Sequence, residues 1–357
     1  MGRIYLLFFL TIVGFLVACD YADDTILNSE EEMMSETNDF VFEQDLNSGI
    51  RVPAEWEPHA ATWMQWPKHY EANMRPAFAN IIQVIQAYEP VHLLTNSEAE
   101  KAEAVQFLSQ QGVSNTNITW HIVPVDNSWP RDNGPIYVTD GTETWIQNWK
   151  FDAWGSNFGK DVEFKNDNLV PIFIGNYLGL RVEDRQDYIL EKGNLEVNGE
   201  GIAVLNWDCQ DDRNPGMTQD EHEAILKEAF GLTKVIWAYG HDPADGTTGH
   251  IDGTARFIDT YTLTITDFGL KTEQDLAKAA EAAGLEVVWY PGSPNWLVGN
   301  GFVAAMGAGD AAFDAELKSL LESFFPDRDV YLLDAKTIET AGGGIHCVTN
   351  DMPAFEN

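Results

Sequence analysis

A cysteine near the end of the chain has the surroundings of a nucleophile. Cys347 follows the run Gly342–Gly344 after two further residues. Adjacent glycines cost conformational entropy, and their usual use is a sharp turn or a close approach of the backbone to a ligand. A thiol on such a turn is a candidate nucleophile. The competing interpretation is a tight turn before an edge strand, with Cys347 as a small buried hydrophobic residue.

A polar segment in the first half of the chain supplies candidate partners. Residues 126–135 form a loop by their proline and glycine content, yet they include Trp129, Arg131 and Asp132. The alternative interpretation is a solvated turn with a surface contact between Arg131 and Asp132.

Two further segments carry titratable side chains. Glu191 opens a turn that precedes residues 195–197, and a plain hairpin turn is the alternative interpretation. His250 and Asp252 are two residues apart, so on a strand both side chains would point to the same face. The alternative for this pair is a core histidine held by a neighbouring carboxylate.

Together these segments predict covalent catalysis on a cation. A cysteine and a histidine are the ordinary pair for nucleophilic catalysis. Several carboxylates near a thiol would raise its pKa and hinder thiolate formation. They make sense if the substrate is a guanidinium, which is planar and binds carboxylates through paired N–H groups. Its bound charge would offset the repulsion and stabilise the thiolate.

The elements that must position these residues recur along the chain. An amphipathic helix ends at a glycine followed by Leu or Val, and a strand follows, as at Gly231 before residues 235–239 and Gly284 before residues 287–290. Capping boxes are predicted at Thr218 and Thr272. Such repeats favour a radially repeated α/β architecture, with a doubly wound sheet as the competing arrangement. Similar units are predicted at residues 112–125 and 179–180, and helices at 76–88 and 311–325 precede strands at 91–95 and 330–333.

Composition limits the function classes. The 357 residues carry a net charge of −36, which argues against binding to nucleic acid or anionic membrane surfaces. The negative field would attract small cations, although adaptation to salt explains it equally well. Of the three cysteines, Cys209 follows an apolar strand and is interpreted as structural, so no disulfide framework is implied.

The N-terminus predicts export. Residues 1–19 form a signal peptide with Arg3, an apolar stretch and an end at Leu16–Cys19 that resembles a bacterial lipobox, so Cys19 would be lipidated. An uncleaved N-terminal anchor is the alternative. Residues 20–50 form an acidic disordered tether, and residues 51–357 form the catalytic domain. The expected location is the bacterial cell envelope, with membrane attachment through the lipid only.

Five ordered segments carry a family resemblance, from residue 51 to about residue 354. The chain resembles the agmatine deiminases and the bacterial-type peptidylarginine deiminases of the guanidine-modifying (pentein) superfamily. The resemblance implies an α/β fold of five ββαβ units, a five-bladed α/β propeller with pseudo-fivefold symmetry. The matching segments are Pro53–Met64, Trp129–Pro135, Phe151–Gly155, Gly249–Asp252 and Gly342–Thr349.

The same resemblance implies roles for individual residues. Cys347 would be the nucleophile and His250 the general acid and base. The guanidinium would be held by Asp132 and Asp252, with Glu191 assisting. Trp129 and Asn295 would contact the bound substrate. No metal and no organic cofactor is expected, and homo-oligomer formation stays open.

The chain departs from the family pattern at a few positions. Lys192 stands where the family usually has glycine, and Thr248 where an acidic residue or asparagine is commoner. Pro294 replaces the residue before the asparagine, and Asn350 and Asp351 stand where paired glutamines are frequent. These departures put the identity of the substrate in doubt, but not the reaction.

The predicted reaction is deimination of agmatine to N-carbamoylputrescine and ammonia through a covalent thiouronium intermediate. Deimination of a C-terminal arginine in a peptide is the first alternative. A zinc hydrolase using His241, His250, Asp252 and Asp132 is a second, although the spacing matches no standard zinc motif. A non-catalytic surface-binding lipoprotein is a third.

Overall fold

The computed structural model describes residues 49–355. The predicted signal peptide 1–19, its Cys19 and residues 20–48 of the predicted tether lie outside this range. The described part is a mixed α/β fold with five small sheets, not one continuous sheet, so the doubly wound alternative is wrong. None of the described helices is long and apolar enough to cross a bilayer.

Short strands alternate with helices throughout the described range. The strands are β1 (His59–Gln65), β2 (Val91–Thr95), β3 (Ile118–Ile122), β4 (Ile136–Thr139), β5 (Thr144–Lys150), β6 (Val182–Ile189), β7 (Glu196–Val197), β8 (Ile202–Asn206), β9 (Lys234–Ala238), β10 (Ala255–Phe257), β11 (Thr262–Thr266), β12 (Glu286–Tyr290), β13 (Leu297–Gly299), β14 (Phe302–Met306), β15 (Asp329–Leu333) and β16 (Asn350–Pro353). The α-helices are α1 (Arg75–Ile85), α2 (Glu98–Gln110), α3 (Pro130–Asn133), α4 (Val170–Leu178), α5 (Trp207–Arg213), α6 (Gln219–Phe230), α7 (Lys271–Ala282), α8 (Ala311–Phe324) and α9 (Lys336–Thr340). The 3-10 helices are η1 (His69–Met74), η2 (Trp154–Ser156), η3 (Asp167–Leu169), η4 (Lys192–Asn194) and η5 (Ile251–Gly253).

Each sheet repeats one strand pattern. In the sheets β4-β5-β6, β7-β8-β9, β10-β11-β12 and β13-β14-β15, the first two strands are antiparallel and the last two are parallel. A parallel pair needs a crossover connection, which α4, α6, α7 and α8 supply in turn. The remaining sheet has the order β16-β1-β2-β3 and follows the same pattern with β16 as its antiparallel strand.

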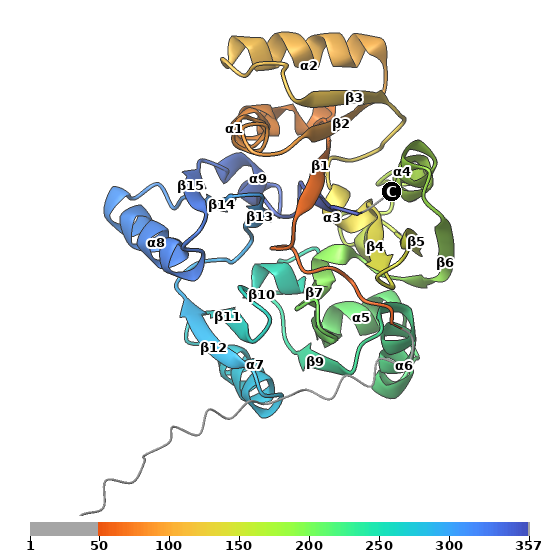
Figure 1. The fold of residues 1–357 in the computed structure, drawn as a ribbon, viewed down its shortest axis with the longest axis vertical. Coiled ribbons are helices and arrows are strands. Elements are labelled where there is room, and N and C mark those ends of the chain that lie inside the picture. The colour runs from red at the N-terminus through yellow and green to blue at the C-terminus, as the bar shows by residue number, and fades with distance from the viewer. Residues whose placement is uncertain (1–48, 356–357) are drawn as a thin grey trace, which may run out of the picture. The chain divides into compact units, whose positions relative to one another are not determined.

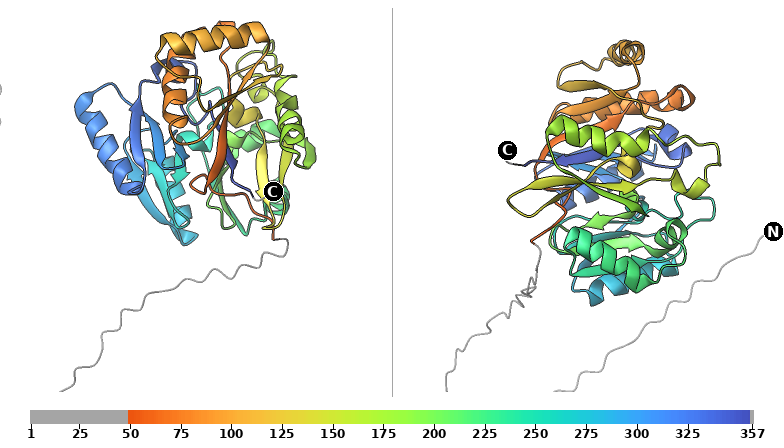
Figure 2. Two further views of the ribbon diagram at one scale, coloured as in Figure 1. Left: turned by 45° about the horizontal axis from the view of Figure 1, so that its top comes forward. Right: turned by 90° about the vertical axis from the view of Figure 1, so that its right-hand side faces the viewer.

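The pairing of β16 with β1 joins the two ends of the described chain. Ala61 pairs with Met352 and Trp63 with Asn350. The five sheets therefore lie around a common centre, and the helices α2, α4, α6, α7 and α8 lie at the periphery (Figure 1). The turned views in Figure 2 show the same placement of α2, α4 and α8. Because β16 returns to this centre, the residues just before it, including Cys347, are brought there too.

Apolar residues fill the space between each sheet and its helix. In one unit, Leu263 and Ile265 of β11 pack with Leu276 and Ala280 of α7, and all four side chains are buried. Alternation along the strand gives each of them one apolar face toward its helix. The sheets are thereby held as separate packed units, and their inner ends are left to carry polar side chains.

The helix ends follow most of the sequence predictions. Thr218 and Glu221 form the predicted capping box of α6, and Gly231 at its other end has φ 64°, a left-handed conformation that suits glycine. The capping box predicted at Thr272 is wrong. The N-cap of helix α7 is Leu270, two residues earlier, and Glu273 accepts a hydrogen bond from its backbone N–H at 2.8 Å.

Candidate active site

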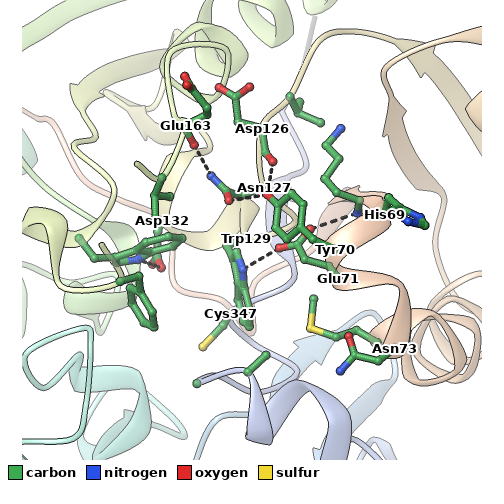
Figure 3. A pocket seen from close by; sticks show the side chains of 18 of the residues that line it. His69, Tyr70, Glu71, Asn73, Asp126, Asn127, Trp129, Asp132, Glu163 and Cys347 are labelled. Atoms are coloured by element: carbon green, nitrogen blue, oxygen red, sulfur yellow. Dashed lines mark hydrogen bonds between the residues drawn. The ribbon is translucent and has the colours of Figure 1, made fainter. Parts of the chain in front are cut away.

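The predicted site residues, far apart in the sequence, meet at one cavity of about 910 Å³. Cys347, Asp132 and Trp129 line it (Figure 3). His250 and Asp252 lie directly behind the lining. Nδ1 of His250 is 3.5 Å from Oδ1 of Asp132, and Oδ2 of Asp252 is 3.7 Å from Sγ of Cys347.

The Cys347 turn is packed against Asn295. Nδ2 of Asn295 donates to Sγ of Cys347 at 3.2 Å, and its Oδ1 accepts from the backbone N–H of His346 at 3.0 Å. A Cβ on Gly344 would lie 2.3 Å from that Oδ1, and a Cβ on Gly343 would lie 2.4 Å from the Trp129 ring. The glycines are therefore required for close approach, here of site side chains to the backbone.

Asp132 lies on a short helix, α3, and not in the predicted loop. The surface contact considered for Arg131 is also wrong, because its side chain is buried. Oδ2 of Asp132 accepts from Nε1 of Trp154 at 2.9 Å, and Oδ1 accepts from the backbone N–H of Gly193 at 3.2 Å. A Cβ on Gly193 would lie 2.5 Å from Nδ1 of His250, so this position also tolerates only glycine.

His250 directly precedes the 3-10 helix η5, so the strand predicted for His250 and Asp252 is wrong. Nε2 of His250 lies 2.6 Å from Oε2 of Glu191. Nδ1 is buried and has no hydrogen-bond partner among the described residues. The free nitrogen therefore points toward Asp132, on the side of the cavity.

Glu191 is held in place by a residue that sequence reasoning missed. Arg213 donates from Nε to Oε1 of Glu191 at 2.8 Å and from Nη2 to Oε2 at 3.2 Å. Arg213 and Cys209 are four residues apart on α5 and therefore share one helix face. That spacing could have indicated that the two side chains share a partner. The partner is Glu191, whose Oε2 lies 3.9 Å from Sγ of Cys209.

Burial and local charge shift the pKa of the groups that would react. Burial, and then the charges of Asp252 and Asp132, raise the pKa of the Cys347 thiol well above its ordinary value. Burial and the charges of Glu191 and Asp252 raise the pKa of Asp132 to about 6. Burial alone would lower the pKa of His250, but the charge of Asp132 and hydrogen bonds with Cys209 and Glu191 raise it well above its ordinary value.

The pKa of Asp252 and Glu191 moves the other way. Burial would raise both, but His346 lowers the pKa of Asp252, and Arg213 and His250 lower the pKa of Glu191. These two groups are therefore carboxylates at neutral pH, next to a protonated His250. The site combines a protonated thiol, a protonated imidazole and a local excess of negative charge.

The outer part of the cavity is also acidic. Nε1 of Trp129 donates to Oε1 of Glu71 at 3.1 Å, which fixes the indole beside the sulfur (Figure 3). Among the described residues that line the cavity, Lys68 is the one lysine and none is an arginine. The acidic lining residues are Glu71, Glu100, Asp126, Asp132, Asp161 and Glu163.

The ligands suggested for a zinc site do not assemble. His241 pairs with Asp208 at 2.9 Å and is partly exposed. The described residues whose ligand atoms come within 4.8 Å of one another are Glu191, Cys209 and His250. Both oxygens of Glu191 there already accept hydrogen bonds from Arg213, whose positive charge would oppose a metal ion.

Several departures from the family pattern lie outside the cavity lining. Lys192 and Asp351 form a buried ion pair at 2.6 Å, so two of the departures compensate each other. Thr248 has φ 62°, an unusual value for a β-branched residue, and its Oγ1 accepts from Nδ2 of Asn157 at 2.9 Å. The departures were expected to affect which substrate is bound. Lys192 and Asp351 do not support this expectation, because they pair with each other.

Comparisons with known proteins place this geometry in a family. The model of the Porphyromonas-type peptidyl-arginine deiminase family matches residues 51–286 and 292–353. The chain is 28% identical to the agmatine deiminase of Ectopseudomonas mendocina (strain ymp), over 86% of this chain and 96% of that protein. A solved agmatine deiminase of Enterococcus faecalis is similar with a TM-score of 0.76 at 23% identity, over 88% of this chain and 98% of that one. An agmatine deiminase of C. jejuni with substrate bound has a TM-score of 0.76 at 20% identity, over 86% and 97%. This chain belongs to the Porphyromonas-type peptidyl-arginine deiminase family.

Proposed function

We propose that the protein hydrolyses agmatine to N-carbamoylputrescine and ammonia, with Cys347 as the nucleophile. The observation that carries this proposal is the excess of carboxylates around a buried thiol. Oδ2 of Asp252 lies 3.7 Å from Sγ of Cys347, and the charges of Asp252 and Asp132 both raise the pKa of its thiol. A guanidinium is the planar cation that such a pair of carboxylates can bind through paired N–H groups.

The reaction follows from these positions. The bound guanidinium lowers the pKa of the thiol, which loses its proton to the water of the cavity. Sγ of Cys347 then attacks the guanidinium carbon and forms a carbon–sulfur bond. His250, whose Nδ1 is free of protein partners, donates a proton to the departing nitrogen, and the carbon–nitrogen bond breaks to release ammonia. His250 then takes a proton from water, which adds to the same carbon. The carbon–sulfur bond breaks and the ureido product leaves.

The other site residues have supporting roles in this proposal. Glu191 holds His250 through Nε2 and is itself fixed by Arg213. Asn295 holds the thiol, and Trp129 forms the wall beside the bound substrate. These side chains therefore bind the cation or keep the two reacting groups in place. Positioning and electrostatic stabilisation are usually the largest contributions of an active site to the rate.

The charge of the cavity favours agmatine over arginine. No arginine is among the described residues that line the cavity, and its carboxylates outnumber its basic side chains. A free or peptide-terminal arginine would bring a carboxylate into this negative field, whereas agmatine brings an ammonium group. The decisive measurement is ammonia and ureido product from agmatine, free arginine and a peptide with C-terminal arginine, using protein without residues 1–19. We expect kcat/KM to be at least ~100-fold higher for agmatine, and a preference for the peptide would overturn the assignment.

We further propose that the five sheets form a five-bladed α/β propeller with pseudo-fivefold symmetry. The common ββαβ pattern of the units and the closure of the first sheet by β16 support this description.

We also propose that the protein is an exported lipoprotein, anchored through Cys19. The apolar stretch that ends at Leu16–Cys19 supports this proposal. Incorporation of a fatty-acid label into the wild-type protein, and its loss in Cys19→Ser, is the expected result. Labelling that persists in Cys19→Ser would contradict it.

A further inference from the structure

His346, next to the nucleophile, is held by a carboxylate at each ring nitrogen. Nδ1 lies 2.7 Å from Oδ2 of Asp252, and Nε2 lies 2.7 Å from Oε2 of Glu55. The pKa of Asp252 and of Glu55 is below the ordinary range, because the nearby cations outweigh the effect of burial. Ionised carboxylates only accept hydrogen bonds, so both nitrogens must carry hydrogen. Two carboxylate oxygens at 2.7 Å are the contacts of a ring that donates from both nitrogens, and this geometry points to an imidazolium.

The groups around this ring come from five parts of the chain and fix it firmly. The backbone oxygen of His346 accepts from Nε of Arg131 on α3 at 3.2 Å. Glu55, from the segment before β1, also pairs with Nη2 of Arg131 at 3.3 Å and with Nη2 of Arg256 on β10 at 3.0 Å. Glu196 on β7 accepts from Nε of Arg256 at 2.8 Å. The ring cannot turn away from Asp252 without also losing its bond to Glu55, which these contacts hold in place.

Asp252 connects the ring to the reacting sulfur. The same oxygen, Oδ2, bonds to Nδ1 of His346 and lies 3.7 Å from Sγ of Cys347. The second oxygen, Oδ1, has no hydrogen bond from the protein among the described residues that surround it. One oxygen of Asp252 is thus committed to His346, and the other is left for a ligand.

We propose that His346 is a positioning residue for the deimination reaction, which orients Asp252 toward the guanidinium and offsets the negative charge around the Cys347 thiol. This inference rests on the proposed function, because it takes Cys347 as the nucleophile. The cation acts through Asp252 and does not touch the substrate itself. An opposite charge within a few ångströms typically shifts a pKa by 1–3 units. Loss of the imidazolium should therefore raise the thiol pKa further.

A second buried histidine in the same region provides a matched control. Nδ1 of His59 lies 3.1 Å from Oε1 of Glu89, and its Nε2 lies 2.7 Å from the backbone oxygen of Glu55. His59 is also buried and has a carboxylate partner, but its ring hydrogen-bonds to Glu89 and Glu55 and not to Asp252 or Cys347. A purely structural role predicts the same effects from the two histidines, whereas our proposal predicts different ones.

The experiment compares His346→Asn, His346→Gln and His59→Gln in the full-length protein. The asparagine amide can replace Nδ1 and donate to Asp252, whereas the glutamine amide can replace Nε2 and donate to Glu55. Both lack the positive charge. The readouts are the rate at which iodoacetamide alkylates Cys347 at pH 8, measured by mass spectrometry, and kcat and KM for agmatine. Thermal unfolding checks that each variant is folded.

We expect both His346 variants to be alkylated about tenfold more slowly than the wild type, because the thiolate is the reacting form and its pKa has risen by about one unit. We expect KM to rise about tenfold in His346→Gln and less than threefold in His346→Asn, since only the latter keeps a donor to Asp252. His59→Gln should lose stability but keep the wild-type alkylation rate.

Alkylation within twofold of wild type in both His346 variants would overturn the proposal, and so would an equal slowing in His59→Gln. If one His346 variant fails to fold, the other decides by the same alkylation rate. The alkylation assay needs no substrate. If the wild type proved inactive on agmatine, the proposed function would fail while the alkylation rates still tested the role of His346.

Discussion

Two groups of buried charges contact the Cys347 turn, and they differ in whether their charges are paired within the protein. The central ion-pair cluster has alternating signs, and its members contact one another at 2.6–3.3 Å. The acidic site group is paired less completely, because Asp132 lines the cavity and its cationic neighbour, Nδ1 of His250, is 3.5 Å from its Oδ1. The cluster consists of Lys192, Asp351, Arg131, Glu55, Arg256 and Glu196, and the site group of Asp132, Asp252, Glu191 and His250.

The comparison shows what the site lacks. A buried charge without a partner costs several kcal/mol. In the ion-pair cluster every charge has at least one partner of opposite sign. Beside the thiol the pairing is incomplete, because Asp132 keeps a raised pKa and Asp252 leaves one oxygen free. We interpret this excess of negative charge as the feature that binds the cation of a substrate. The predictions below test that difference between the two groups.

The largest effect is expected from the nucleophile itself. Cys347→Ala should lower kcat for ammonia release by at least ~10⁴-fold, because no other group of the site can form the covalent intermediate. The variant should unfold at nearly the wild-type temperature, since the hydrogen bonds of the thiol to Asn295 and Asp252 are long, at 3.2–3.7 Å. Turnover within tenfold of wild type would show that Cys347 is not the nucleophile.

Asp132→Asn should have the next largest effect. The substitution removes one of the two charges that face the guanidinium and should lower kcat/KM for agmatine by about 10²–10³-fold, mainly through KM. Steady-state kinetics separates the two constants. An unchanged KM would mean that Asp132 does not bind the cation.

A pair of electrophiles of the same shape tests whether a cation activates the thiol. The cationic 2-chloroacetamidine should alkylate Cys347 at least ~10-fold faster than the neutral 2-chloroacetamide, because it binds between the carboxylates and lowers the thiol pKa. The preference should largely disappear in Asp132→Asn. Equal rates for the two compounds in the wild type would remove the argument that the charge imbalance serves a cation.

Much of this arrangement could be predicted from the sequence. The helix–glycine–strand units gave the radial repeat, because glycine C-caps and apolar alternation are local signals. The structure brings Cys347, His250 and the carboxylates together, and the chemistry proposed for them was inferred from residue types. The backbone around the site was harder to predict. The segments at Asp132 and His250 are short helices and not a loop and a strand, since their conformation is set by long-range contacts such as Trp154 to Asp132.

The ion-pair cluster could not be predicted at all. Lys192 and Asp351 are 159 residues apart and looked like unrelated departures from a family pattern, yet they pair at 2.6 Å. Nothing near either residue in the sequence indicates the other. Only the return of β16 to β1 brings them together, because it places the end of the described chain beside the centre of the fold.

The pH dependence should report the unpaired side of the comparison. With a pKa of about 6, Asp132 is largely protonated at pH 5 and ionised at pH 7. Guanidinium binding needs the ionised form, so kcat/KM should be about tenfold lower at pH 5 than at pH 7. Stability runs in the opposite direction, because a carboxyl whose pKa is raised on folding stabilises the fold below its unfolded pKa and loses this contribution as pH rises through 6. A flat kcat/KM over this range would contradict the raised pKa.

The smallest effect on turnover is expected on the paired side. In Lys192→Met, Asp351 keeps Arg131 as a partner at 2.8 Å, so the loss of unfolding free energy should be about 1–3 kcal/mol and kcat/KM should stay within threefold of wild type. Arg131→Met is the matched control. It leaves Glu55 and Asp351 each without one cation and should cost about 3–5 kcal/mol, measured by denaturant unfolding. If Lys192→Met lowered kcat/KM tenfold without loss of stability, the cluster would contribute to catalysis directly, and the division between a paired structural group and an unpaired reactive group would be wrong.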